Sequence, residues 1–166
     1  MIFLTLGTQL PFDRLVRAVD EWCHARGRDD VFGQIAEPGD AGYRPRHFDW
    51  VAHLPPADYG ARFAAARLIV AHAGMGSIIT AMELGKPIVL MPRRADLAEH
   101  RNDHQLATAR RFADRPGIHV VPDAAALART LDRLSDRTGP APHAVSPFAD
   151  PRLIEALRGM IRPPRG

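Results

Sequence analysis

A glycine-rich loop near residue 75 has the residue types that bind phosphate. It follows the apolar run Leu68-Ile-Val-Ala and reads His72-Ala-Gly-Met-Gly-Ser77, with a helical pattern after it. Its two glycines allow a tight turn, and Ser77 is placed to cap a helix covering residues 77–84. A helix that begins there points free backbone N–H groups and the positive end of its dipole into the loop. The pattern therefore predicts an anion site suited to a phosphate or diphosphate.

The same pattern has an ordinary structural explanation. Gly-x-Gly-Ser also describes a simple turn from a strand into a helix. The loop lacks both the third glycine of the dinucleotide fingerprint and the Gly-Lys-Ser/Thr ending of a P-loop. His72 either hydrogen-bonds a phosphate oxygen or is a buried histidine satisfied within the protein.

The elements that would position this loop alternate between strands and helices. Short apolar runs predict strands at 2–6, 31–35, 48–51, 68–71, 88–91 and 118–121. Helical spacing begins at Phe12 and recurs at 58–66, 77–85, 103–113 and 123–136. Alternation of this kind predicts an α/β fold, a Rossmann-like and mostly parallel sheet with helices on both faces. Ligands bind such sheets at the carboxyl ends of the strands, so we expect the site in the loops that follow the strands.

Length and composition indicate one globular domain. The 166 residues are 46% hydrophobic and 25% charged, and we assign residues 1–150 to the domain and 151–166 to a last helix and a frayed tail. The net charge of +3 is carried almost wholly by arginine, since Lys86 is the only lysine. This charge fits an anionic ligand or a membrane-surface setting, although scattered arginines also arise from codon composition. No aromatic-basic pattern indicates nucleic acid.

The sequence also predicts a location. No apolar run approaches the roughly 20 residues needed to cross a bilayer, and the start lacks the features of a secretory signal. We therefore expect a cytoplasmic protein. Cys23 is the only cysteine, so it forms no internal disulfide or CxxC motif, and we expect it to pack in the core.

Four segments in series resemble the C-terminal domain of glycosyltransferase family 28. They are the loop above, Glu83-Leu-Gly-Lys-Pro87, Met91-Pro-Arg-Arg94 and His100-Arg-Asn-Asp-His-Gln-Leu-Ala107. The chain is most similar to the short, single-domain members, which are the catalytic subunit of the dolichol-pathway N-acetylglucosaminyltransferase and its bacterial exopolysaccharide counterparts. Leu6-Gly7-Thr8 followed by Phe12-Asp13 also fits those proteins. The resemblance covers about residues 1–122.

The resemblance implies the donor-binding, C-terminal half of a GT-B glycosyltransferase, with His72 and Glu83 as catalytic candidates. In related transferases a Glu three residues after the Ser or Thr holds the ribose hydroxyls of the nucleotide. Thr80 stands at that position here, and Glu83 one turn later either takes the role or faces solvent. The implied donor-binding residues are Gly7, Thr8, Gly74, Met75, Gly76, Ser77, Thr80, Arg93, Arg94, Asp103, His104 and Gln105.

Arg93 and Arg94 follow a predicted strand and so should lie on the ligand edge. One of them is expected to neutralise the departing UDP or to grip a donor carboxylate such as that of glucuronate. Surface arginine is the default for at least one of the two. Asp103, His104 and Gln105 match the family element that reaches the donor sugar and diphosphate.

The implied activity is inverting transfer of a sugar from a UDP-sugar to a polyprenyl-diphosphate-linked glycan acceptor, with no metal and no cofactor. The general base is expected from a membrane-anchored, acceptor-binding partner subunit that recruits this chain to the inner face of the membrane. A UDP-sugar 2-epimerase shares the fold but needs both domains in one chain, and a non-catalytic UDP-sugar-binding subunit is the alternative outside enzymes.

Overall fold

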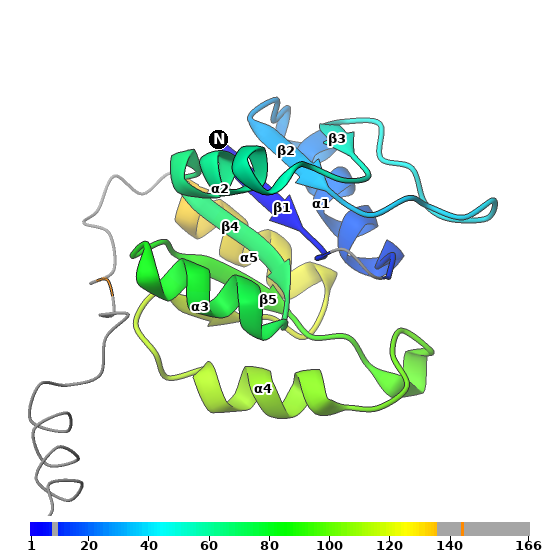
Figure 1. Ribbon diagram of the computed structural model, residues 1–166. Coiled ribbons are helices and arrows are strands. Elements are labelled where there is room, and N and C mark those ends of the chain that lie inside the picture. The colour runs from blue at the N-terminus through cyan, green and yellow to red at the C-terminus, as the bar shows by residue number, and fades with distance from the viewer. Residues whose placement is uncertain (8–9, 136–143, 145–166) are drawn as a thin grey trace, which may run out of the picture.

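A single six-stranded parallel sheet organises the computed structural model, which describes residues 1–7, 10–135 and 144 (Figure 1). Each predicted strand is confirmed to within one residue at either end. The order across the sheet is β3-β2-β1-β4-β5-β6. The strands are β1 (Ile2–Thr5), β2 (Val31–Gln34), β3 (Asp49–Val51), β4 (Leu68–His72), β5 (Ile88–Met91) and β6 (Ile118–Val120).

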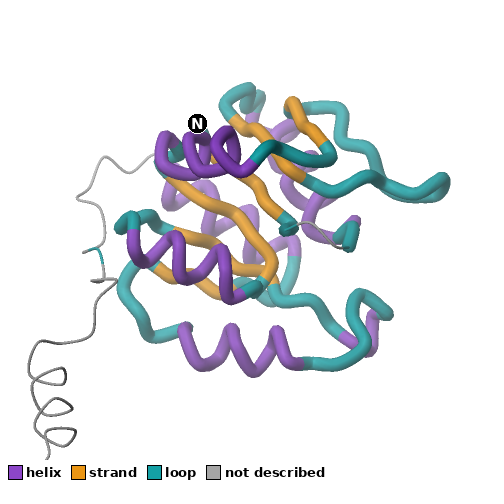
Figure 2. The backbone as a smooth tube through the Cα atoms, viewed as in Figure 1, coloured by secondary structure: helices purple, strands orange, loops and turns teal. Residues whose placement is uncertain are grey.

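Helices cover both faces of the sheet, as the alternation predicts (Figure 2). Helices α1 (Asp13–Arg26) and α5 (Ala124–Ser135) pack on one face, with Leu15, Val19, Leu127 and Leu131 in the core there. The other face carries α2 (Pro56–Ala65), α3 (Met75–Glu83) and α4 (His104–Phe112), and a short 3-10 helix, η1 (Ala95–Leu97), precedes α4.

The strand order places a crevice at one edge of the sheet. The chain builds outward from β1 through β2 to β3, then crosses back and continues on the other side of β1 from β4 to β6. Loops after β1 and β4 therefore leave in different directions from two neighbouring strands. This reversal point is where parallel sheets bind nucleotides.

Several expectations concern residues that lie outside the described part of the chain. Thr8 and the last helix and tail at 151–166 belong to this group. Within residues 1–7 and 10–135, none of the helices combines the length and hydrophobicity needed to cross a membrane. Cys23 is buried in the core, as expected, and burial raises the pKa of its thiol to about 12.

A buried carboxylate fixes the loop that the sequence predicts between β2 and β3. Asp20 of α1 accepts hydrogen bonds from the Tyr43 hydroxyl at 2.7 Å and from the backbone N–H groups of Arg46 at 2.9 Å and His47 at 2.7 Å. Burial opposes ionisation of Asp20, but these hydrogen bonds outweigh it and hold its pKa below the usual value. The ionised carboxylate thus joins α1 to the loop.

We expect Asp20→Asn to lower the free energy of unfolding at pH 7 by about 2 kcal/mol, because an amide has one acceptor oxygen where the carboxylate has two. A carboxyl whose folded-state pKa is lowered stabilises the fold above its unfolded pKa and loses that contribution as the pH falls through the folded value. The difference between wild type and variant should therefore shrink below about pH 4. Urea unfolding at pH 7 and pH 3 measures both, and an equal difference at the two pH values would contradict the assignment.

Candidate functional site

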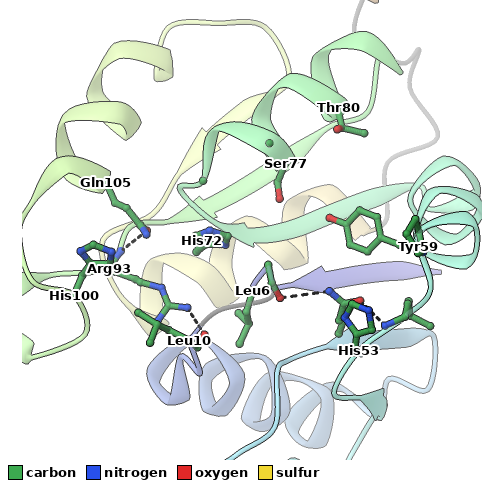
Figure 3. Close-up of a pocket in the computed structure, with 16 residues that line it drawn as sticks. Leu6, Leu10, His53, Tyr59, His72, Ser77, Thr80, Arg93, His100 and Gln105 are labelled. Carbon is green, nitrogen blue, oxygen red and sulfur yellow. Dashed lines mark hydrogen bonds between the residues drawn. The ribbon is translucent and has the colours of Figure 1, made fainter.

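A pocket of about 520 Å³ opens at the carboxyl ends of β1, β2, β4 and β5 (Figure 3). It lies where the strand order reverses, as expected from the topology. Eight of the residues singled out from the sequence line it: Gly7, His72, Gly74, Gly76, Ser77, Thr80, Arg93 and Gln105. Eight further residues complete the lining: Leu6, Leu10, Gln34, His53, Leu54, Pro56, Tyr59 and His100.

The start of α3 faces this pocket. The prediction that Ser77 caps the helix is wrong, because α3 begins at Met75 with Gly74 at the N-cap, and Ser77 is buried in the first turn. The first helical hydrogen bond runs from the Ile78 N–H to the Gly74 carbonyl at 3.2 Å. No side chain in the described part of the chain caps this end of α3, so the N–H groups of its first turn are left for a ligand.

The packing of the His72 ring against Gly74 explains why α3 begins at Met75. A Cβ on Gly74 would collide with the His72 ring, at 2.8 Å from Cε1 and closer still to Nε2. Gly74 itself has an ordinary extended conformation, with φ of −90° and ψ of 136°. This glycine is therefore required by the close approach of His72, and the chain turns into α3 directly after that contact.

Gly76 has a different reason to be a glycine. A Cβ there would have no described atom within 4 Å beyond its chain neighbours and the backbone of its own helix, and the residue lies exposed in the first turn of α3 at the pocket. A side chain at this position would project over the free N–H groups of the turn. The absence of one keeps the backbone accessible to a bulky anion.

His72 is a neutral base in a positively charged setting. Burial and, after it, the charge of Arg93 lower its pKa to about 4. Its Nδ1 is buried and has no hydrogen-bond partner among the described residues. A backbone hydrogen bond with Thr5 acts against the lowering of its pKa, and Nε2 faces the glycine loop.

Arg93 is buried under the pocket and braces the loop after β1. Its guanidinium donates to the carbonyl oxygens of Leu10 at 2.6 Å and Pro11 at 2.5 Å, and lies 4.6 Å from the centre of the Phe12 ring. Burial lowers its pKa to about 10, so it stays charged at neutral pH. Each amino group has one carbonyl partner, which fixes the charged guanidinium beside the pocket.

Gln105 links α4 to the same region. The residue is buried, and its Oε1 accepts a hydrogen bond from the Arg93 backbone N–H at 3.1 Å. The Nε2 group makes no hydrogen bond to a described residue and can donate to a ligand. Gln105 therefore lies beside Arg93 in the pocket lining.

The opposite end of the pocket comes from residues that the sequence reasoning missed. The buried Gln34 accepts from the Leu54 N–H at 2.9 Å through Oε1, and its Nε2 lies 3.4 Å from the Gly7 carbonyl. Figure 3 shows Tyr59 and His53 at this end, away from Arg93, His100 and Gln105. Nothing in the local sequence marks Gln34 or Tyr59, because only the sheet order brings β2 and α2 to the glycine loop.

Several predicted site residues lie away from the pocket lining. Met75 and Glu83 are exposed on α3, and Arg94 pairs with Asp96 at the surface. Asp103 is also outside the lining, and its carboxylate accepts a hydrogen bond from the Ala95 N–H at 2.9 Å. The exposed His104 bonds to Asn102, and Thr8 falls outside the described residues.

The loop between β5 and α4 is tied down by an ion pair. Arg14 of α1 binds both carboxylate oxygens of Glu99, at 2.5 and 2.8 Å, and donates to the Pro92 carbonyl at 2.9 Å. The second oxygen of Glu99 also accepts from the Arg94 N–H at 2.9 Å. This bracing fixes the loop that carries Arg93 and His100 into the site.

The pocket lining in the described part of the chain contains basic side chains and no carboxylate. Arg93 is a cation, three of the lining residues are histidines, and no Asp or Glu lines the pocket in the described part of the chain. Among these residues, no group of three or more His, Cys, Asp or Glu is arranged to hold a metal ion. Together with the uncapped start of α3, this pocket suits a diphosphate.

Comparison with known proteins agrees with this geometry. Residues 1–135 match the family described as the glycosyltransferase family 28 C-terminal domain. A relative from Bacteroides thetaiotaomicron, UDP-N-acetylglucosamine–N-acetylmuramyl-(pentapeptide) pyrophosphoryl-undecaprenol N-acetylglucosamine transferase, is 37% identical over 75 residues. That match covers 45% of this chain and 19% of the relative, so the chain spans a small part of the curated relatives that it matches.

Solved structures share the fold. The solution structure of ALG13 superposes with a TM-score of 0.59 at 19% identity, covering 94% of this chain and 93% of that one. The crystal structure of MurG from Acinetobacter baumannii superposes with a TM-score of 0.58 at 18% identity, covering 81% of this chain and 41% of that one. With the family model matching most of its length, this chain belongs to the glycosyltransferase family 28 C-terminal domains.

Proposed function

We propose that this chain is the donor-binding, catalytic subunit of a two-component inverting glycosyltransferase. It binds a UDP-sugar, and a partner supplies the half that binds a lipid-linked glycan acceptor. The observation that carries the proposal is the uncapped start of α3 in a pocket that contains Arg93 and no described carboxylate. Such a site stabilises the negative charge that develops on a departing nucleoside diphosphate.

In the proposed reaction the acceptor hydroxyl oxygen attacks the anomeric carbon of the donor sugar. The bond between that carbon and the diphosphate oxygen breaks, and UDP departs with the electron pair. The hydroxyl proton passes to a general base. Because no described pocket residue is a carboxylate and the His72 ring packs against Gly74, we assign the base to the acceptor side. N–H groups of α3 and the charge of Arg93 stabilise the leaving group, so no metal is required, and an excess of EDTA should leave transfer unchanged.

The two ends of the pocket suggest how the donor lies. The diphosphate sits at the first turn of α3, beside Gly76. The sugar then extends toward Gln105, whose Nε2 is free to donate, and the nucleoside extends toward Tyr59 and His53 (Figure 3). In this orientation Thr80, which lines the pocket one turn into α3, lies along the ribose.

Thr80→Val should weaken UDP binding about fivefold, because a hydroxyl that contacts the ribose contributes about 1 kcal/mol. Glu83→Gln should leave the affinity unchanged, since Glu83 is exposed and outside the pocket lining. Calorimetric titration of both variants with UDP measures the contrast. The reverse result, with Glu83 affecting binding and Thr80 not, would assign the ribose contact to Glu83.

The lipid-linked acceptor and the membrane partner are supported by the relatives. The Bacteroides relative carries undecaprenol and pyrophosphoryl in its name, and MurG extends well beyond the part that superposes on this chain. We propose that a membrane-anchored subunit takes the place of that remainder and holds this chain at the inner face of the membrane. An exopolysaccharide or related glycan is the proposed product.

Reconstitution tests the proposal. The full chain is mixed with membranes that contain the candidate acceptor subunit and with labelled UDP-glucose, UDP-galactose, UDP-glucuronate and UDP-N-acetylglucosamine. Transfer of label to lipid that needs both components supports it. Isomerisation of the sugar by the chain alone would indicate an epimerase, and binding without turnover would indicate a non-catalytic subunit.

A further inference from the structure

Two imidazoles reach the pocket from separate elements. His72 ends β4, and His100 lies in the loop between η1 and α4. In both rings Nδ1 is buried and has no hydrogen-bond partner among the described residues. His72 packs over Gly74 with Nε2 toward the glycine loop, and the backbone of Thr5 acts against the lowering of its pKa. His100 lies edge-on against His104, with the ring centroids 4.5 Å apart. Both residues line the pocket, so both rings lie close to where a ligand would bind.

The surroundings of these rings contain cations and few anions. Arg93 is the charged neighbour, and Figure 3 shows His100, Arg93 and Gln105 gathered at one end of the pocket. The nearest acidic groups have other partners: Glu99 binds Arg14, and Asp103 accepts from Ala95.

The other elements packed against the two rings add no acidic group. The described residues that β1 and the first turn of α3 bring to the pocket, Leu6, Gly7, Gly76 and Ser77, do not titrate. His53, at the far end, is the remaining histidine of the lining. An unliganded pocket therefore holds a fixed positive charge with no carboxylate to balance it.

We propose that His100 is a second ligand-binding imidazole and that the His72–His100 pair takes up a proton when the donor diphosphate binds beside it. This inference rests on the proposed function. It adds His100 as a ligand-binding residue and the uptake of one proton on donor binding, and the proposed reaction requires neither. Burial and Arg93 keep His72 neutral in the free protein. An adjacent diphosphate reverses that balance, because a nearby anion favours the imidazolium form.

The sign of the pH dependence follows from this coupling. Binding raises the imidazole pKa above its free-state value, so affinity increases as the pH falls toward the bound-state pKa. UDP-sugars are suitable probes, because both of their phosphates are esterified and do not titrate near neutral pH. Any proton taken up between pH 6 and 8 then comes to the protein.

Calorimetry of the full chain with UDP-glucose, UDP-galactose, UDP-glucuronate and UDP-N-acetylglucosamine tests the inference. Titrations at pH 7 in PIPES and in Tris, whose ionisation enthalpies differ, give the number of protons taken up. The wild type should show net uptake and higher affinity at pH 6 than at pH 8. His100→Gln, which keeps a donor but does not titrate, should weaken binding about fivefold or more and remove most of the uptake. His72→Gln should reduce the uptake as well.

His24→Gln is the matched control, because His24 is exposed in the last turn of α1, at the other edge of the sheet. It should bind and take up protons as the wild type does. Net uptake of zero in the wild type, or unchanged affinity and uptake in His100→Gln, would overturn the inference while leaving the proposed function intact. Failure of the wild type to bind any of the four UDP-sugars would overturn both.

Discussion

Replacing Gly76 with alanine should leave the chain at least as stable as the wild type and weaken its affinity for UDP by about tenfold or more, or about 1.4 kcal/mol. Alanine is favoured over glycine in helices by about 0.5–1 kcal/mol, and the new methyl group meets no described atom beyond its chain neighbours and the backbone of its own helix. The loss of affinity arises because that methyl group projects over the backbone N–H groups that the diphosphate must reach. Thermal unfolding and calorimetry with UDP measure the two effects separately.

Gly60→Ala provides the matched control for this change. Gly60 lies within α2, a Cβ there also has no atom within 4 Å, and the residue does not line the pocket. It should gain similar stability and keep the wild-type affinity for UDP. Equal affinities of the two alanine variants would show that the start of α3 does not contact the ligand.

Arg93→Met should lower the free energy of unfolding by about 2–3 kcal/mol, because it removes two charge-assisted hydrogen bonds from a buried side chain. Those bonds hold the carbonyl groups of Leu10 and Pro11, so the loop after β1 loses its support. UDP affinity should fall as well, since the buried cation is lost from the pocket. Urea unfolding and UDP titration of the same preparation measure both losses.

The neighbouring Arg94 is the control. It is paired with Asp96 at the surface and does not line the pocket, so Arg94→Met should leave stability and UDP affinity unchanged. Arg93→Lys should recover part of the affinity through its charge but little of the stability, because lysine lacks the fork that reaches two carbonyls. If Arg93→Met and Arg94→Met changed the free energy of unfolding and the UDP affinity by similar amounts, the different roles assigned to the two arginines would be contradicted.

The fold could be predicted from the sequence because its four central strands, β2, β1, β4 and β5, are buried along almost their whole length. Strands of that kind read as continuous apolar runs, and Ile88-Val-Leu-Met is entirely buried in β5. The start of α3 could not be placed in the same way. The sequence offers Ser77 as a capping residue, whereas the helix begins at Met75 because Gly74 packs under His72, a contact that depends on the folded position of β4.

Only one side of the pocket could be predicted from the sequence. Gly74, Gly76, Arg93 and Gln105 stand next to recognisable motifs, and the structure brings them into one pocket. The other side depends on the sheet order, which brings β2 and α2 next to the glycine loop.

Side-chain directions account for the remaining differences at the site. Asp103 and His104 precede Gln105 directly in the sequence, yet Gln105 alone turns into the pocket, because it is the buried residue in the first turn of α4. A motif read from the sequence cannot separate these three, since their directions follow from the way α4 packs.

The central claim is that the start of α3 binds the diphosphate of an activated sugar. Isothermal titration of the full chain with UDP and with uridine tests it most directly. The account predicts that UDP binds and that uridine, which lacks the diphosphate, binds at least about tenfold more weakly. Equal affinities for the two compounds, or no affinity for UDP and every UDP-sugar tried, would contradict it.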